Sequence, residues 1–162
     1  MILRYKNDNN KFNNIKEIAK CYFNMSDKLV SKLKNKQCIL LNNKIAKIND
    51  KIMLNDIIEF NLSYPEKSEN IVPIKMVLDI IYEDESFLII NKSSNMPVHP
   101  SANHYADSLS NGVKYYFNQI NLNKKIRPVN RLDKDTSGLV VFAKNEYIQE
   151  CLIKQMQARK IL

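Results

Sequence analysis

Residues 127–143 read Arg127-Pro128-Val129-Asn130-Arg131-Leu132-Asp133-Lys134-Asp135-Thr136-Ser137-Gly138-Leu139-Val140-Val141-Phe142-Ala143, a polar loop that runs directly into an apolar strand. A loop this dense in polar groups has a structural explanation, in which carboxylates cap backbone amides and Gly138 accommodates a positive φ. If residues 131–133 are extended, however, the side chains of Arg131 and Asp133 share a face. A carboxylate held ionised beside a fixed cation can act as a nucleophile or base without a metal or cofactor. The pattern leaves both interpretations open, and spacing alone does not exclude Asp135 from the same role.

The rest of the second half predicts an α+β unit around this loop. Two strand candidates, 77–85 and 87–92, are separated by an acidic turn. Two prolines hold residues 96–101 extended. Apolar residues at helical spacing predict two helices, one with Leu109, Val113, Tyr116 and Phe117 on its inner face and one, capped by Asn145, that buries Ile148, Leu152 and Met156.

The first half predicts two helices beside a small sheet. Asn13 or Asn14 can cap the first helix, and Ser26 can cap the second. Short apolar segments around an Asn-Asn turn and an alternating strand at the end of this half predict the sheet. A polar stretch that contains a proline follows. The expected organisation is therefore α+β, with a two-helix/sheet domain at 1–62, a linker at 63–76 and a mixed or antiparallel α+β domain at 77–162.

The charge of the chain indicates a polyanionic partner. The 162 residues include 25 Lys+Arg and 17 Asp+Glu, which gives a formal net charge of +8. Residues 1–62 hold 12 basic and 6 acidic residues, net +6, while residues 63–162 hold 13 and 11, net +2. Nucleic acid is the leading candidate for such a surface, and we expect it to bind the first half.

Composition excludes several other classes of protein. With two glycines, the chain cannot form a Gly-rich dinucleotide or P-loop cradle, so no nucleotide cofactor is expected. Three scattered cysteines form neither a disulfide framework nor a metal cluster, and they fit a reducing cytoplasm. No apolar run reaches the ~18 residues of a membrane span, and the first residues lack the apolar core of a signal peptide.

Lysines gather on the second predicted helix and on the hairpin after it. Lys28, Lys32 and Lys36 recur every four residues, and Lys44 follows in the hairpin. A solvated helix face is the plain interpretation, but seven lysines against two aspartates in residues 25–51 favour a phosphate-backbone site. The segment resembles the S-four-type RNA-binding domain through Ser26-Asp27-Lys28-Leu29-Val30-Ser31-Lys32-Leu33, Ile39-Leu40-Leu41-Asn42-Asn43-Lys44-Ile45 and Asn55-Asp56-Ile57-Ile58.

The polar loop at 127–139 resembles the active-site signature of the RluA-like family of RNA pseudouridine synthases, whose pattern is His/Asn-Arg-Leu-Asp-x-x-Thr-Ser-Gly-Leu. Members of this family often carry the S-four-type domain at the N-terminus. The resemblance implies cofactor-free isomerisation of uridine to pseudouridine in ribosomal or transfer RNA, in the cytoplasm. The strand pair and extended loop that precede the signature in the family are matched by Tyr82-Glu83-Asp84, Ile89-Ile90-Asn91-Lys92 and Met96-Pro97-Val98-His99-Pro100-Ser101.

The resemblance also implies roles for individual residues. Asp133 would be the essential carboxylate, attacking the uridine sugar or taking a sugar proton while the base is detached and rejoined through carbon. Arg131 would fill the space left by the flipped uridine. The residues that would shape the loop or face the substrate are Asn130, Thr136, Ser137, Gly138 and His99, the last of which is alternatively a loop hydrogen-bonding group.

The sequence departs from the family in ways that open alternatives. In the family the chain continues past Leu162 into strands that carry an active-site tyrosine and a basic residue paired with the aspartate. The sequence therefore also allows a truncated, catalytically inactive RNA-binding remnant, a standalone RNA-binding module, or a different hydrolytic or isomerase reaction at the carboxylate loop. The lysines contact phosphates and specify no base, so neither the target uridine nor the oligomeric state follows from the pattern.

Overall fold

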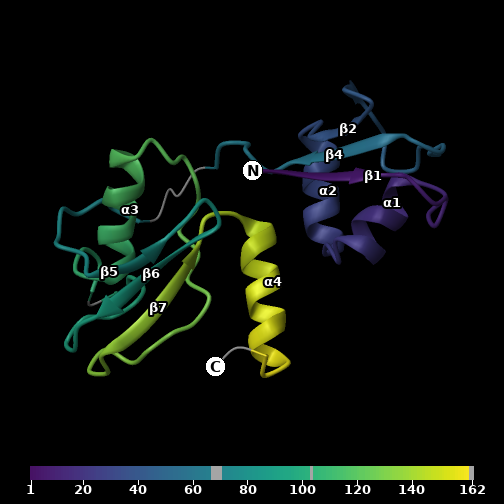
Figure 1. Cartoon of the computed structure of the whole chain (residues 1–162). Coiled ribbons are helices and arrows are strands. Elements are labelled where there is room, and N and C mark those ends of the chain that lie inside the picture. The colour runs from purple at the N-terminus through teal and green to yellow at the C-terminus, as the bar shows by residue number, and fades with distance from the viewer. Residues whose placement is uncertain (67–70, 103, 161–162) are drawn as a thin grey trace. The chain divides into compact units, whose positions relative to one another are not determined.

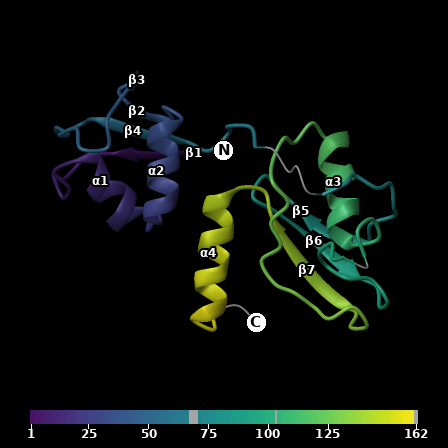
Figure 2. The ribbon, with the colours of Figure 1, turned by 180° about the vertical axis from the view of Figure 1, so that it is seen from behind.

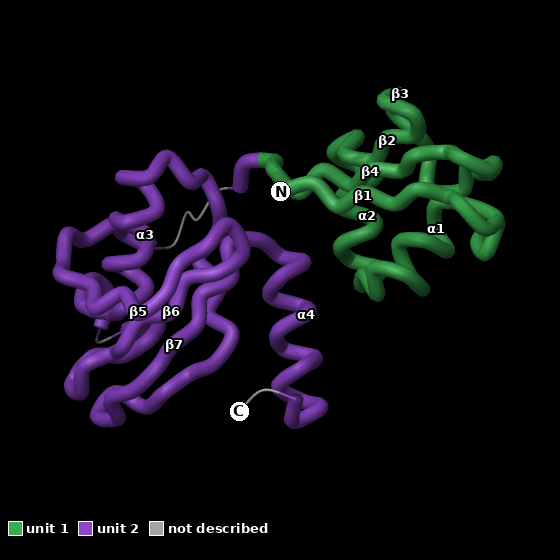
Figure 3. Tube along the Cα trace, viewed as in Figure 1, with its two compact units in different colours: residues 1–64 green, residues 65–162 purple. Residues whose placement is uncertain are grey.

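The computed structural model describes residues 1–66, 71–102 and 104–160, and the chain divides into two compact units, Met1–Tyr64 and Pro65–Leu162 (Figure 1, Figure 3). Each unit combines short helices with one antiparallel sheet, which agrees with the α+β class expected from the sequence. In the described part of the chain, no helix has the length and apolar character that a membrane crossing requires.

Unit 1 is a four-stranded antiparallel sheet with helices packed on it. The strands lie in the order β1 (Ile2–Lys6), β4 (Ile57–Asn61), β2 (Ile39–Leu41) and β3 (Lys44–Ile45). The Asn-Asn turn between β2 and β3 has φ values of 50° and 65°, a left-handed conformation that asparagine tolerates. The helical elements of this unit are α1 (Ile15–Glu17), the π-helical turn η1 (Ile18–Tyr22) and α2 (Asp27–Asn35).

Side-chain caps begin both helical segments of unit 1, as the sequence predicts. Asn14 accepts a hydrogen bond from the amide of Glu17 at 3.0 Å, and Ser26 accepts one from the amide of Leu29 at 3.1 Å. The first segment departs from the predicted regular helix because it widens into the π-helical turn η1 before it ends. The core of the unit includes the fully buried side chains of Ile15, Ile18, Met25, Leu29, Leu33, Ile39, Ile58 and Phe60.

Unit 2 is built on a three-stranded antiparallel sheet in the order β5 (Ile80–Glu83), β6 (Phe87–Lys92) and β7 (Gly138–Ala143). Helix α3 (Leu109–Gln119) lies along the sheet, and α4 (Glu146–Gln157) stands beside β7 in both views (Figure 1, Figure 2). The core between α3 and the sheet is formed by Leu88, Ile90, Val98, Leu109, Val113, Phe117, Ile126, Val140 and Phe142.

Helix α4 is less buried than the sequence predicts. The cap is as expected, because Asn145 accepts a hydrogen bond from the amide of Ile148 at 2.9 Å. Its apolar residues Ile148, Leu152 and Met156 are nevertheless only half-buried. The helix packs against β7 and, through Glu146 and Gln149, against residues 127–128, and Glu146 is the one buried residue among its twelve.

The predicted linker at 63–76 differs from the structure at both ends. Tyr64 is buried in unit 1, with 8% of its surface exposed. Residues 71–76 pack on α3, because Asn111 donates its side-chain amide to Val72 O at 2.8 Å and accepts the amide of Ile74 on its carbonyl at 3.1 Å. Gly112 permits this approach, since a Cβ at that position would collide with Met76. Residues 67–70 of the predicted linker lie outside the described residues.

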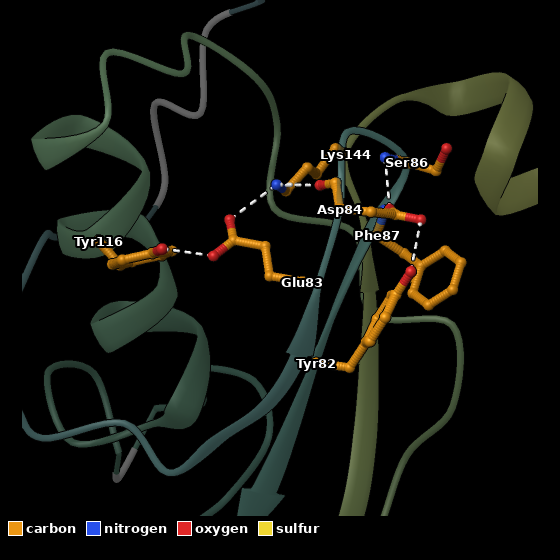
Figure 4. A network of polar contacts seen from close by, with 7 residues as sticks. All are labelled: Tyr82, Glu83, Asp84, Ser86, Phe87, Tyr116 and Lys144. Atoms are coloured by element: carbon orange, nitrogen blue, oxygen red, sulfur yellow. Dashed lines mark hydrogen bonds and ion pairs between the residues drawn. The ribbon is translucent and has the colours of Figure 1, made fainter.

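A polar network ties α3 to the sheet at the end where β6 begins and β7 finishes (Figure 4). Glu83 accepts hydrogen bonds from the hydroxyl of Tyr116 at 2.5 Å and from Lys144 Nζ at 2.7 Å. Lys144 also donates to the carbonyl of Asp84, whose carboxylate accepts two backbone amides of the turn. The hydrogen bond to Glu83, with burial, raises the pKa of Tyr116 to about 12. This network stabilises the end of the sheet away from the 130–138 loop.

Candidate functional site

The polar loop of residues 130–138 is anchored on strand β7. The segment before it runs beside the strand, and the amide of Val129 donates to Val141 O at 2.8 Å. The side chain of Asn130 bridges two further backbone groups of β7, donating to Leu139 O at 2.8 Å and accepting from Val141 N at 2.9 Å. The amide group of Asn130 therefore holds the loop on the sheet.

Within the loop, the side chains alternate between the core and solvent. Leu132 packs against the core of unit 2, while Arg131 and Asp133 on either side of it are exposed. A turn follows, in which the amide of Thr136 donates to Asp133 O at 3.1 Å. Gly138 has a φ of 141°, and a Cβ there would lie 3.3 Å from a methyl group of Leu132. The loop thus presents Arg131 and Asp133 outward from a backbone that the turn and the glycine shape.

Lys92 connects this loop to the extended segment at 96–100. It ends β6, pairs with Gly138 across the ladder and is only 1% exposed. Its ammonium donates to three carbonyl oxygens, those of Ser93 at 2.9 Å, Met96 at 2.7 Å and Lys134 at 3.0 Å. The carbonyl of Lys134 also accepts the amide of Met96 at 3.1 Å. One buried lysine therefore joins two loops that are far apart in the sequence.

The electrostatic surroundings of Lys92 include both carboxylates of the loop. Burial lowers the pKa of Lys92, and the nearby charges of Asp135 and Asp133 partly oppose this shift. Lys92 is not among the site residues that the sequence predicts. The signal that could have revealed it is the alternation of β6, in which Leu88, Ile90 and Lys92 share the buried face.

His99 lies at the end of the extended segment, half-buried, beside Ser110 of α3. Ser110 has a single hydroxyl hydrogen and donates it to Val98 O at 2.7 Å. The 3.3 Å contact between Ser110 Oγ and His99 Nδ1 therefore runs from Nδ1–H to the hydroxyl oxygen. This leaves Nε2 of His99 as an acceptor. Burial and, secondarily, the positive charge of Arg131 lower the pKa of His99, so the ring is uncharged at neutral pH.

A cluster of ion pairs around Arg127 fixes the segment that precedes the loop. Arg127 makes two contacts of 2.8 Å with the carboxylate of Glu66 and lies 3.7 Å from a carboxylate oxygen of Glu146. All three side chains are at most 10% exposed. Bidentate pairing of this kind fixes orientation as well as charge. The cluster thereby ties the segment before the loop to the first turn of α4.

The structure brings some of the predicted site residues together and leaves others apart. The charge of Arg131 acts on His99, and those of Asp133 and Asp135 act on Lys92, so these groups are neighbours in unit 2. Thr136 and Ser137 are exposed on the same loop. Within residues 1–66, 71–102 and 104–160, no group of three His, Cys, Asp or Glu side chains could hold a metal ion.

The predicted RNA-binding lysines all belong to unit 1. Helix α2 buries Leu29, Val30 and Leu33 against the sheet of its own unit. Its residues Lys28 and Lys32 therefore lie on the other faces, exposed and half-exposed respectively. Lys36, directly after the helix, and Lys44, on β3, are exposed. We refer to these four side chains, taken together, as the α2–β3 lysine surface.

Comparison with known proteins finds RNA pseudouridine synthases to which this chain is similar. A profile of the family described as RNA pseudouridylate synthase matches residues 86–162. Ribosomal large subunit pseudouridine synthase D of Blochmanniella floridana is 37% identical over 129 residues, which cover 76% of this chain and 40% of that protein. The protein of the same name from Escherichia coli (strain K12) is 35% identical over 126 residues, which cover 77% of this chain and 38% of that protein.

The solved structure titled Human RNA Pseudouridylate Synthase Domain Containing 4 superposes with a TM-score of 0.43 and 20% identity, over 50% of this chain and 30% of that one. The chain spans 40% and 38% of the length of the two curated relatives. The matched residues, 86–162, contain β6, the lysine that ends it, and the whole 130–138 loop. Through these residues, the second half of the chain is similar to RNA pseudouridylate synthases.

Proposed function

We propose that this chain is an RNA pseudouridine synthase, which isomerises uridine to pseudouridine within RNA without a metal or cofactor. The observation that carries the proposal is the 130–138 loop. It presents Arg131 and Asp133 to solvent on either side of the packed Leu132, and the buried Lys92 holds its backbone. The proposal is further supported by the family match of residues 86–162, which include this loop.

Each loop residue has a role in the proposed reaction. Asp133 attacks the uridine sugar or takes a sugar proton, while the uracil is detached and rejoined through carbon. Arg131 fills the space that the flipped uridine leaves, because a base must leave its stack before an enzyme can act on it. Thr136, Ser137 and Gly138 shape the turn, and His99 offers Nε2 as an acceptor beside Arg131.

We also propose that unit 1 is an S-four-type RNA-binding domain that contacts the RNA backbone through Lys28, Lys32, Lys36 and Lys44. The support is a helix whose apolar side is buried and whose lysines face outward, in a half of the chain with net charge +6. Lysines at helical spacing contact phosphates and fix register.

Because the relatives are named as ribosomal large subunit enzymes, we propose that the substrate is large-subunit ribosomal RNA and that the reaction takes place in the cytoplasm.

The chemical proposal is tested by incubating the protein with unmodified large-subunit ribosomal RNA transcribed in vitro and mapping pseudouridine. Asp133→Asn is compared with Asp135→Asn, a matched control that removes a carboxylate two residues away on the same exposed loop. We expect pseudouridine with wild type and Asp135→Asn and none with Asp133→Asn. RNA binding without pseudouridine formation by wild type would refute the enzyme and favour an RNA-binding remnant.

The RNA-binding proposal is tested separately by its salt dependence. Replacing Lys28, Lys32 and Lys36 with glutamine should weaken RNA binding and flatten the plot of log affinity against log salt by ~0.7–0.9 per lysine lost. The control replaces three exposed lysines of unit 2, Lys75, Lys125 and Lys154, and so removes the same charge from the chain. Equal changes of slope in the two triple variants would show that the α2–β3 lysine surface is not the RNA contact.

A further inference from the structure

Tyr64, the last residue of unit 1, lies beneath Lys32 of α2 and Lys36, the residue directly after that helix. The Nζ atoms of Lys32 and Lys36 are 5.1 and 5.3 Å from the centre of its ring. Tyr64 is 8% exposed, so most of its surface is covered. The sequence analysis assigned Tyr64 to the linker and gave it no function.

This arrangement places two like charges on one aromatic ring. Lysines four residues apart on a helix repel each other. The face of an aromatic ring attracts an ammonium within about 6 Å of its centre, so the ring of Tyr64 favours both cations at this position. The ammonium groups of Lys32 and Lys36 are therefore already close together in the protein without a bound anion.

We propose that Tyr64 is a positioning residue of the α2–β3 lysine surface: its ring orients the ammonium groups of Lys32 and Lys36 for the backbone phosphates of RNA. This inference rests on the proposed RNA binding by unit 1. Immobilising a lysine on binding costs conformational entropy, and a side chain that is already oriented in the free protein loses less of it. Tyr64 thus strengthens binding without touching the RNA and without adding charge.

Two substitutions separate the aromatic face from the other properties of Tyr64. Tyr64→Leu removes the ring while keeping an apolar side chain, and Tyr64→Phe keeps the ring and removes the hydroxyl. Affinity of the full chain for a fluorescein-labelled RNA hairpin is measured over a series of salt concentrations. We expect Tyr64→Leu to bind about threefold to tenfold more weakly and Tyr64→Phe to bind like wild type. We expect no change of salt slope in either variant, because both keep every lysine.

A double-mutant cycle distinguishes positioning from a general effect on folding. In a Lys32→Gln/Lys36→Gln background, Tyr64→Leu should have no further effect on affinity, because the ring then has no cation to orient. A purely structural role of Tyr64 would give the same loss in both backgrounds. In the free protein, nuclear magnetic resonance should show ring-current shifts of the Lys32 and Lys36 ε-methylene protons that disappear in Tyr64→Leu.

The outcomes for the two proposals are distinct. If Lys28→Gln and the Lys32→Gln/Lys36→Gln variant leave the affinity and the salt slope unchanged, RNA binding by this surface is refuted, and the role of Tyr64 with it. If the lysine variants weaken binding while Tyr64→Leu binds like wild type, the RNA surface stands and the positioning role alone is overturned. The positioning role would also be overturned if the effects of Tyr64→Leu and Lys32→Gln/Lys36→Gln on affinity were additive, or if Tyr64→Leu changed the salt slope.

Discussion

Replacing Lys92 with methionine tests how the candidate catalytic loop is held. The ammonium of Lys92 is buried and donates to the carbonyls of Ser93, Met96 and Lys134 at 2.7–3.0 Å. Methionine has a similar length and apolar stem, so Lys92→Met removes these three hydrogen bonds with little change in packing volume. The extended segment at 96–100 and the 130–138 loop should then lose their common anchor.

The expected loss follows from the balance of two opposing contributions. Each hydrogen bond from a charged donor stabilises the fold by about 1.5–3 kcal/mol. Burial of the ammonium opposes this by several kcal/mol. The lowered pKa of Lys92 shows that burial outweighs the favourable charges of Asp135 and Asp133. We therefore expect Lys92→Met to reduce the free energy of unfolding by about 2–4 kcal/mol, well below the sum of three such bonds.

The assay combines urea unfolding with hydrogen exchange of the full chain. The amide of Met96, which donates to Lys134 O at 3.1 Å, reports directly on contact between the two loops. Its exchange in Lys92→Met should be at least about tenfold faster than in wild type under native conditions, which corresponds to ~1.4 kcal/mol. The matched control is Lys144→Met, another buried lysine of unit 2, whose partners are Glu83 and Asp84 at the other end of the sheet.

The effect of Lys92→Met should be confined to the end of the sheet where Lys92 lies, and the control variant can refute this. In Lys144→Met the amides of residues 83–87 should exchange faster while the amide of Met96 stays protected. If Lys92→Met leaves Met96 as protected as in wild type, or if the two variants accelerate it equally, then Lys92 does not anchor the loop.

Three further predictions concern titration and backbone strain. The folded-state pKa of His99 is lowered from 6.5, so protonation of this ring favours the unfolded chain. Wild type should therefore lose stability as pH falls below 6.5, and His99→Gln should lose less. Urea unfolding midpoints of the two proteins that fall in parallel with pH would contradict this. Because the pKa of Tyr116 is raised from 10.0 to about 12, its ionisation favours the unfolded chain, so stability should fall above pH 10.0 and fall less in Tyr116→Phe; equal alkaline losses would contradict this. Gly138→Ala should lower the free energy of unfolding by about 1–3 kcal/mol, because φ at this position is 141° and a side chain there is strained. An unchanged calorimetric Tm would contradict this.

Local patterns in the sequence predicted where helices begin and which face of a strand is buried. The caps at Asn14, Ser26 and Asn145 lie where the residue types predict them, because an N-cap depends on a few neighbouring atoms. The alternation in β6 likewise depends on the period of a strand alone. Burial of α4 was predicted less well, since its depth depends on which other elements cover it, and helical spacing contains no information on that.

By itself, the sequence determined the class of the fold, the loop that presents Arg131 and Asp133, and the similarity to pseudouridine synthases. The reason is that a motif of closely spaced residues can be identified from the order of the amino acids alone. Only the tertiary structure showed that Lys92 joins two distant loops and that Tyr64 lies under Lys32 and Lys36. The physical reason is that both are contacts between segments far apart in the chain. A lysine at the end of a strand and a tyrosine after one acquire these roles from the groups that folding brings beside them.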